Sequence, residues 1–253
     1  MSEHPILFSA EMVRAILDGK KTQTRRTRGL EDVNIASDLW KLFKIGELGY
    51  MTKKRYQGRF GAYFHSEEIE ERTLAICPAV CPYGQPDDLL WVRETHYRFG
   101  HWVKNGFTAT GKQRYKFIPE TQEVLFYDNP PEKLANGKSK DIHGWYKRPS
   151  IFMPKWATRI WLRVKSVRVE RVQDISDADA IAEGVAILDI DTIGRKVYPD
   201  YQVPKGFLWQ SHNQYYSAKQ SFMTLWDSIN EKRGYGWDAN PWVWVVEFEK
   251  VKG

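Results

Sequence analysis

Residues 158–173 constrain the fold most, because they carry the clearest strand pattern in the chain. Their sequence, Thr-Arg-Ile-Trp-Leu-Arg-Val-Lys-Ser-Val-Arg-Val-Glu-Arg-Val-Gln, largely alternates apolar with polar side chains, which is typical of a half-buried β-strand. Shorter runs of the same kind predict strands over residues 87–97 and 242–251. Helical and turn segments separate the three runs, so we expect them to join one curved, mostly antiparallel sheet in an α+β protein.

A short helix is expected directly after the long strand. Ser176 is a suitable N-cap, and two aspartates follow it in the first turn, where carboxylates interact favourably with the helix dipole. Glu183 lies at the other end of the helix, just before Gly184. Because the C-terminal end of a helix carries partial negative charge, an ionised Glu183 is unfavourable there unless a cation lies nearby.

The length and composition of the chain fit a globular protein. With 253 residues, 42% of them hydrophobic, we expect a single domain with insertions at about residues 30–80, 98–149 and 185–216. Turn residues are frequent in these segments, and we expect irregular structure there, with a short helix near 38–45 and a hairpin near 115–127. No apolar run reaches the roughly 18 residues that cross a bilayer, and no signal-peptide pattern is present, so we expect a cytoplasmic protein.

Charge and aromatic content suggest a class of partner. The formal net charge is +6, and aromatic residues make up 14% of the chain. Positive charge favours a polyanionic partner, and aromatic rings can stack on bases. Both properties coincide in residues 50–64, where Lys53, Lys54, Arg55 and Tyr56 are candidate contacts to single-stranded RNA or DNA. The alternative is a hairpin that packs on the rest of the protein. The 98–149 insertion, in which lysines and aromatic residues recur, is a second candidate for contacts to phosphates.

The two cysteines, Cys77 and Cys81, do not form a recognisable motif. Three residues separate them, which suits neither a disulfide-stapled scaffold nor a CxxC redox pair. A zinc site would need two further ligands, for which His65 and His96 are the nearest candidates. Two ordinary thiols are the simpler interpretation, and we expect no metal site.

Residues 13–26 predict a short helix followed by a dense polar cluster. Gly19 is placed to end the helix, because glycine adopts the left-handed conformation that closes many helices. In an extended segment after it, Lys21, Gln23 and Arg25 would share one face and Thr24 and Arg26 the other. A cluster of this kind is either a solvated basic turn or a functional site.

The polar cluster also resembles a family signature. Gly19, Lys21 and Arg26 match the pattern Gly-x-Lys-x-x-Glu-x-Arg of the ASCH (activating signal cointegrator homology) domains, which are PUA-like β-barrels, with Thr24 in place of the Glu. In small bacterial ASCH proteins that hydrolyse N4-acetylcytidine, the same spacing reads Gly-x-Lys-x-x-Thr. This resemblance implies that Lys21 and Thr24 are catalytic, together with a helical glutamate that corresponds to Glu183. We therefore expect Lys21, Thr24 and Glu183 to converge.

Further stretches are similar to ASCH proteins of phage and prophage genomes, including Cys81-Pro-Tyr-Gly-Gln-Pro and Gly234-Tyr-Gly-Trp-Asp-Ala-Asn-Pro-Trp. The resemblance covers roughly four segments, which are residues 5–30, 81–96, 150–185 and 220–250. It implies a PUA-like barrel with one of two functions. The first is a cofactor-independent amidohydrolase that removes an acyl group from N4 of a cytosine nucleoside or a similar modified base. The second is a binding module for a modified base or single-stranded RNA or DNA, with nuclease activity in some relatives.

Four further residues are candidate binding groups. Arg26 belongs to the signature, and Trp237 lies in the glycine-containing aromatic loop near the end of the chain. Arg93 and Glu94 are consecutive charges on opposite faces of the predicted strand 87–97. Because an unpaired buried charge is very costly, each must reach water, a partner or a pocket. An ion pair at the strand edge and a role in ligand binding both satisfy this requirement.

Overall fold

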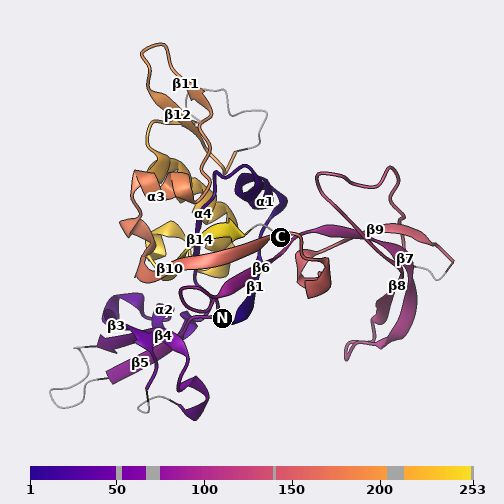
Figure 1. Ribbon diagram of the computed structural model, residues 1–253, viewed down its shortest axis with the longest axis horizontal. Coiled ribbons are helices and arrows are strands. Elements are labelled where there is room, and N and C mark those ends of the chain that lie inside the picture. The colour runs from indigo at the N-terminus through magenta and orange to yellow at the C-terminus, as the bar shows by residue number, and fades with distance from the viewer. Residues whose placement is uncertain (50–52, 67–74, 139–140, 204–213, 252–253) are drawn as a thin grey trace. The chain divides into compact units, whose positions relative to one another are not determined.

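The protein is an α+β protein, with 41% strand and 23% helix. The structure, a computed structural model, describes residues 1–49, 53–66, 75–138, 141–203 and 214–251. The described strands form four sheets, none of which closes into a barrel (Figure 1). The contacts divide the chain into two compact units. Unit 1 contains Met1–His4, Ala15–Leu90 and Leu162–Val251, and unit 2 contains Pro5–Arg14 and Trp91–Trp161.

The largest sheet has five strands in the order β1-β6-β10-β14-β2. Their bounds are β1 (Glu3–Leu7), β6 (Leu89–Arg93), β10 (Trp161–Arg171), β14 (Trp242–Val251) and β2 (Gln23–Arg26). The prediction that the three alternating runs share one sheet is confirmed, because β6, β10 and β14 lie within them. The run 87–97 is divided, since β6 ends at Arg93 and a strand of another sheet begins at His96.

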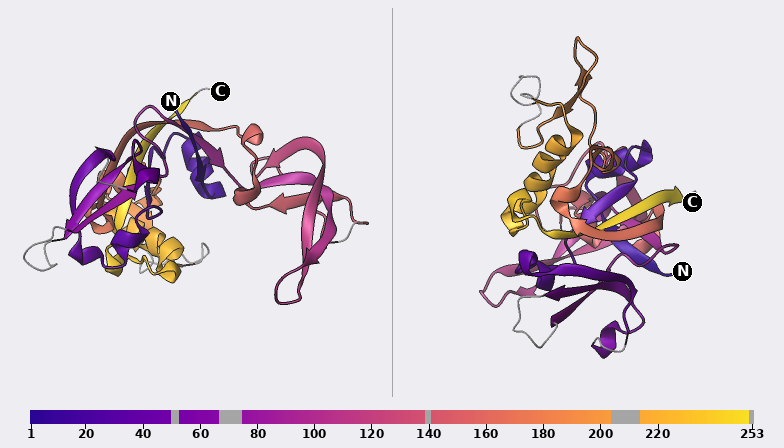
Figure 2. Two further views of the ribbon diagram at one scale, coloured as in Figure 1. Left: turned by 90° about the horizontal axis from the view of Figure 1, so that it is seen from below. Right: turned by 90° about the vertical axis from the view of Figure 1, so that its left-hand side faces the viewer.

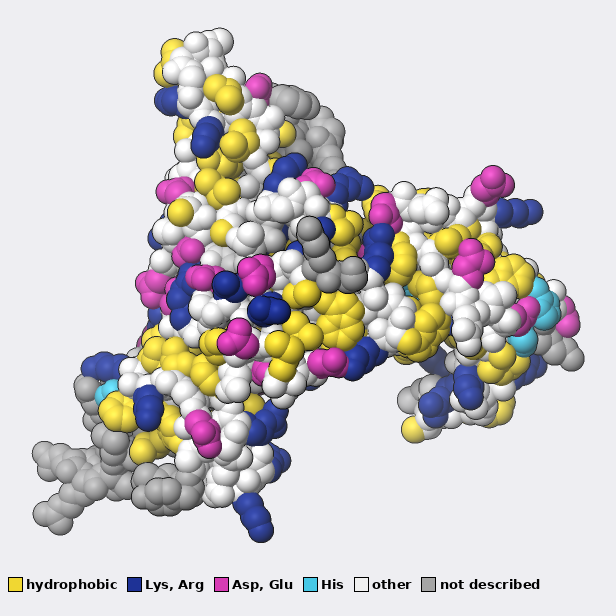
Figure 3. All heavy atoms as spheres, viewed as in Figure 1, with side chains coloured by type: hydrophobic (Ala, Val, Ile, Leu, Met, Phe, Trp, Pro, Cys, Tyr) yellow, Lys and Arg dark blue, Asp and Glu magenta, His cyan; other side chains and the backbone are white. Residues whose placement is uncertain are grey.

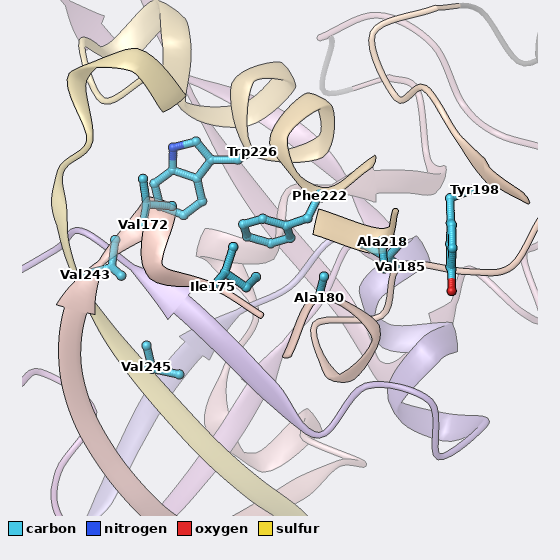
Figure 4. Close-up of a cluster of buried hydrophobic side chains, with 10 residues drawn as sticks. All are labelled: Val172, Ile175, Ala180, Val185, Tyr198, Ala218, Phe222, Trp226, Val243 and Val245. Carbon is cyan, nitrogen blue, oxygen red and sulfur yellow. The ribbon is translucent and has the colours of Figure 1, made fainter. Parts of the chain in front are cut away.

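The α-helices of the described residues are α1 (Ala10–Leu17), α2 (Glu31–Asn34), α3 (Asp177–Ala182) and α4 (Ala218–Asn230). Ser176 caps α3 as predicted, because its hydroxyl accepts a hydrogen bond of 3.1 Å from the amide of Asp179. Helix α4 is amphipathic, and its Phe222 and Trp226 rings lie in a core of apolar side chains from α3, β14 and the neighbouring loops (Figure 4). The other members of this core are Val172, Ile175, Ala180, Val185, Tyr198, Ala218, Val243 and Val245.

Each predicted insertion contains a small sheet of its own. The strands are β3 (Lys41–Glu47), β4 (Phe60–Ser66) and β5 (Ala75–Val80); β7 (His96–Phe107), β8 (Gln113–Phe126) and β9 (Gly144–Arg148); and β11 (Asp189–Ile190), β12 (Lys196–Pro199) and β13 (Gln214–Tyr215). Neighbouring strands in these sheets are antiparallel. Figure 2 shows β7, β8 and β9 as one twisted sheet.

Two local predictions in the insertions are wrong. The segment 38–45 is a 3-10 turn (Ser37–Leu39) followed by strand β3, because its apolar side chains pair across to β4 instead of forming a helical face. The hairpin near 115–127 is a single long strand, β8, whose partner β7 precedes it. The hairpin turn lies earlier, where the amide of Thr108 donates to the carbonyl of Lys112 at 2.8 Å.

Among the described residues, no helix combines the length and apolar character needed to cross a lipid bilayer.

Candidate functional site

The backbone around Lys21 is held by two helices. Helix α1 ends where Gly19 adopts a left-handed conformation with φ of 70°, and the amides of Lys20 and Lys21 then both donate to the carbonyl of Ala15, at 2.8 and 3.0 Å. The next amide, of Thr22, donates to the carbonyl of Ala182 at 2.9 Å. The turn after Gly19 therefore lies against the C-terminal end of α3, where Glu183 follows.

Gly184 makes this close approach possible. Its φ is 96°, a conformation that residues with a Cβ rarely adopt. A Cβ built at this position would lie 3.4 Å from the Cβ atoms of both Lys21 and Ala15. Glycine is thus favoured here by backbone conformation, and an added Cβ would be in van der Waals contact with the turn that carries Lys21.

Lys21 and Glu183 form a buried ion pair. The Lys21 Nζ donates to the Glu183 Oε2 at 2.8 Å and to the Glu183 main-chain carbonyl at 2.6 Å. The two residues are 2% and 6% exposed. Burial lowers the pKa of the Lys21 amine below its ordinary value, although the Glu183 carboxylate opposes this shift. The structure thus brings together the cation and the helix-end carboxylate that the sequence suggested should meet.

Arg25 extends the ion pair to two further carboxylates. Its Nη1 donates to the Glu183 Oε1 at 3.2 Å, its Nε to the Glu170 Oε1 at 3.0 Å and its Nη2 to the Asp179 Oδ2 at 3.1 Å. The Arg25 side chain is buried, and its guanidinium carbon lies 5.8 Å from the centre of the Phe222 ring. One guanidinium therefore joins strand β2 to β10, to α3 and to the apolar core.

Arg168, on β10, continues the network towards solvent. It donates to Glu170 and to Asp179, each at 3.0 Å, and it also pairs with Glu247 on β14. We call the whole set the β2–α3 network, and it consists of Lys21, Arg25, Arg168, Glu170, Asp179, Glu183 and Glu247. Three cations face four carboxylates, so the network carries a formal charge of −1 when every group is ionised.

Thr24 is the third residue that the family resemblance made catalytic. It is 1% exposed, and its Cα pairs with Val246 on β14. Its neighbours Gln23 and Arg25 both bond to α3 or to Glu183, and the Gln23 contact is a 2.9 Å bond to the carbonyl of Asp179. Because side chains alternate along a strand, Thr24 belongs to the opposite face of β2 from Gln23 and Arg25. The contacts around Glu183 thus support a role for Lys21 and Arg25, and the role of Thr24 stays a prediction.

Trp237 and Arg26 occupy different environments. The Trp237 ring packs edge-on against Phe222 with centroids 6.4 Å apart, and the Trp237 amide donates to the Asp227 carboxylate at 2.6 Å, so this residue supports the core beside α4. Arg26 is half-buried on β2, opposite Trp244. Burial is the main cause that lowers the pKa of Lys21, and the positive charge of Arg26 lowers it further.

Glu94 and Arg93 have separate partners. Glu94 is buried, and both of its carboxylate oxygens accept bonds of 2.8 Å from the guanidinium of Arg159. Arg159 also bonds to Asp128 at 2.7 Å. Arg93 bonds to the carbonyl of Ile151 and lies over the ring of Trp91. The ion pair that satisfies Glu94 is therefore formed with a residue 65 positions away, which strand alternation alone could not identify.

The basic segment near residue 53 is exposed. Lys53, Lys54 and Arg55 all face solvent, and the Arg55 guanidinium stacks on the ring of Tyr56. Residues 50–52 of the predicted aromatic segment lie outside the described part of the chain.

Both cysteines are free thiols. Burial raises the pKa of Cys81 to about 12 and also raises the pKa of Cys77, so both thiols stay protonated at neutral pH.

A second group of functional candidates lies in unit 2, largely within the 98–149 insertion that the sequence predicted to contact nucleic-acid phosphates, although the sequence did not identify its individual residues. The Arg148 guanidinium lies 4.7 Å from the Trp102 ring centre, 4.6 Å from that of Phe117 and 4.7 Å from that of Phe152. Lys138 also lies over the Trp102 ring, at 5.3 Å. The charge balance of this segment is the sequence feature that points to it. Residues 91–161 contain 13 Lys and Arg against 6 Asp and Glu, an excess of positive charge larger than the net charge of the whole chain.

A scan against protein-family models finds no match to this chain, and searches of curated proteins and of solved structures find no similar protein. The function of the chain must therefore be inferred from its own contacts and from the motif residues.

Proposed function

We propose that the protein is an amidohydrolase that removes an acyl group from the exocyclic N4 of an acylated cytosine nucleoside or a similar modified base. The observation that carries this proposal is the buried contact of 2.8 Å between the Lys21 amine and Glu183, with a Lys21 pKa lowered by burial. A lysine whose pKa is lowered in this way can act as a general base. The motif spacing at Gly19, Lys21 and Thr24 supports the substrate class. The same resemblance supports a PUA-like origin for the five-stranded sheet.

The proposed reaction needs one proton to move twice. The neutral Lys21 amine takes a proton from water as the water oxygen bonds to the acyl carbon. The bond from the acyl carbon to N4 then breaks, and N4 receives the proton from the Lys21 ammonium. Glu183 stabilises the ammonium between the two transfers, and Arg25 holds the Glu183 carboxylate in place. The products are a carboxylic acid and the free cytosine amine.

The test is hydrolysis of N4-acetylcytidine to cytidine, measured by chromatography. We expect Lys21→Ala and Glu183→Gln to lower turnover by roughly 10²-fold or more, the scale expected when a proton-transfer group is removed. Lys20→Ala is the matched control, because Lys20 is adjacent, largely exposed and paired with the exposed Asp18 at 3.2 Å. Thr24→Val tests whether water or the threonine hydroxyl is the nucleophile. The variant should keep most of the activity if water attacks the acyl carbon, and it should lose the activity if the hydroxyl attacks.

Loss of activity through misfolding must be distinguished from loss of the base. Small alkyl amines added to Lys21→Ala should partly restore turnover if the missing amine is the base, and they should have no effect on a merely unfolded variant. Absence of hydrolysis of any N4-acylated cytosine by the natural protein would overturn the proposal, as would full activity in Lys21→Ala.

A second candidate function is the binding of single-stranded RNA or DNA by unit 2. The specific observation is the concentration of positive charge beside aromatic rings on the β8-β7-β9 sheet and the turns after it, where Phe152 and Trp156 are 59% and 60% exposed. Figure 3 shows Lys and Arg side chains beside hydrophobic ones on this sheet. Cations that hold phosphates and rings that stack on bases are the usual components of single-strand binding.

This function is tested by the salt dependence of binding to a labelled single-stranded oligonucleotide. Removal of three exposed lysines, in Lys116→Gln/Lys138→Gln/Lys147→Gln, should flatten the salt slope by roughly 0.7 for each of them that neutralises a phosphate. Lys53→Gln/Lys54→Gln/Arg55→Gln tests residues 50–64, the other segment that the sequence favoured. Lys44→Gln/Lys165→Gln is a control for charge removal elsewhere. Binding that does not depend on salt, or no binding at low salt, would exclude this function.

A further inference from the structure

The sheet of unit 2 brings two histidines and a glutamate together from three separate segments. His101 lies on the central strand β7, Glu120 on β8, and His143 immediately before β9. His101 pairs with Ile118, so Glu120, two residues further along β8, lies diagonally from it on the same face. Gly100 pairs with Gly144, and continuing that register by one residue brings His143 opposite His101.

The three side chains direct their polar atoms to one point. The Nδ1 atoms of His101 and His143 both contact the same carboxylate oxygen, Glu120 Oε1, the latter at 2.8 Å. The imidazole centroids lie 4.6 Å apart with the ring planes inclined by 38°. One potential ligand atom from each residue lies within 4.8 Å of the other two.

We propose that His101, Glu120 and His143 form a binding site for a divalent transition-metal ion such as Zn²⁺. Imidazole nitrogens and a carboxylate oxygen are ordinary zinc ligands, and two histidines with one glutamate leave a coordination position for water. When no metal ion is bound, each imidazole can donate a hydrogen bond to the Glu120 carboxylate only if its Nδ1 atom carries the proton. One divalent ion replaces both protons and lies between the same atoms.

The geometry needs only small side-chain movements. A tetrahedral ion about 2.1 Å from each ligand sets the ligand atoms roughly 3.4 Å apart, a separation inside the 4.8 Å that now encloses these atoms. The side chains of His101, Glu120 and His143 are 19%, 30% and 49% exposed, so an ion can enter from solvent and keep bound water. An occupied site would join the segment before β9 to both other strands of the sheet. Figure 3 shows histidine side chains on this sheet next to acidic ones.

The experiment is a titration of the full, tag-free chain with ZnCl₂, followed by calorimetry and by thermal unfolding. We expect one ion per chain and a rise in the unfolding temperature when the ion is present, because an ion that binds only the folded state stabilises it. Glu120→Gln and His143→Gln should each weaken binding at least tenfold, since removal of an outer-shell partner alone costs roughly that much. Glu123→Gln is the matched control, because Glu123 is an exposed carboxylate on the same strand.

A second readout separates coordination from loose adsorption. Co²⁺ bound by this set should give visible absorption bands that Zn²⁺ displaces, and these bands should be absent in Glu120→Gln and present in Glu123→Gln. Equal Zn²⁺ affinity in the natural protein and in both ligand variants would overturn the proposal. So would a stoichiometry well below one ion per chain, because the site as proposed is complete within a single chain.

Discussion

The cations around Lys21 and Arg25 in unit 1 and those around Arg148 and Lys138 in unit 2 are held in different ways. In unit 1, Lys21 and Arg25 are buried and each bonds to carboxylates, so their charges are compensated within the fold. In unit 2, Arg148 and Lys138 lie over aromatic rings near solvent, and the segment 91–161 keeps a large excess of positive charge. Buried ion pairs are expensive to break, because the remaining charge is left without a partner or water. Cations on ring faces contribute less to folding and stay available to an external anion.

The largest effect should follow from breaking the β2–α3 network. Arg25→Met removes the guanidinium that contacts Glu170, Asp179 and Glu183 together, and it leaves buried negative charge behind. We expect the free energy of unfolding to fall by roughly 3–5 kcal/mol, as for other buried ion pairs from which one partner is removed. Urea denaturation of the full chain measures this decrease.

Arg148→Met is the comparison variant in unit 2. The Arg148 guanidinium packs on the Trp102 and Phe117 rings, and the methionine side chain can still cover part of their faces, so we expect a decrease of about 1 kcal/mol. Similar decreases for Arg25→Met and Arg148→Met would show that the two units do not differ in the way described.

The second-largest effect should be a loss of folding stability at acidic pH, and we expect it to arise from a histidine in unit 2. His96 is 1% exposed, and burial lowers its pKa to about 4 from an ordinary value of 6.5. Below pH 6.5 the unfolded chain takes up this proton before the folded chain does, so stability falls as the pH decreases from 6.5 to 4 and is fully present above 6.5. The decrease attributable to His96 is at most about 3 kcal/mol.

His96→Gln isolates this contribution. Glutamine can donate to the Glu94 carbonyl, as the His96 Nδ1 does at 3.2 Å, but it does not titrate. The difference in unfolding free energy between about pH 7 and about pH 4.5 should be smaller in this variant than in the natural protein. If this difference is the same in the variant and in the natural protein, the loss of stability in acid must come from carboxylates and not from His96. Asp179 is one candidate, because Arg25 and Arg168 lower its pKa against the opposing effect of burial.

The Lys21–Glu183 pair of the β2–α3 network could be predicted from local sequence. Strand alternation placed Lys21 and Arg25 on one face, and the electrostatics of a helix end required a cation near Glu183. The other carboxylates could not be identified, because Glu170 and Glu247 reach Arg25 and Arg168 only through the order of strands in the sheet. Long-range pairing of this kind has no signature within a short window of sequence.

The sheet of unit 2 was not predicted, for a different reason. Its strands β7 and β8 carry many Lys, Arg, Gly and aromatic residues, and much of their surface is partly exposed on both faces. Without a clean alternation of apolar and polar side chains, the pattern resembles a loop. The same property hid the convergence of His101, Glu120 and His143, which depends on the register of three strands.

A smaller effect should follow from backbone strain beside the turn that carries Lys21. Gly184→Ala forces a residue with a Cβ to adopt a φ of 96°, and we expect the unfolding free energy to fall by roughly 1–2 kcal/mol. Gly194→Ala is the matched control, because Gly194 has a φ of 85° but no described atom within 4 Å of a built Cβ. Both variants should be destabilised to a similar extent. Only Gly184→Ala should also lower the hydrolytic rate, since its new methyl group contacts the Lys21 side chain.

The smallest effect on stability should come from Lys138→Gln. The Lys138 Nζ lies 5.3 Å from the Trp102 ring centre and 5.8 Å from that of Tyr115, and the side chain is exposed, so its removal should change the unfolding free energy by less than about 1 kcal/mol. Its effect on the affinity for single-stranded RNA should be measurable at low salt and should decrease as salt is added, because the interaction is with phosphate. Lys20→Gln, an exposed lysine of unit 1, should change neither property. A large decrease in stability in Lys138→Gln would mean that the cations on these rings hold the sheet together, and the contrast between the two units would then disappear.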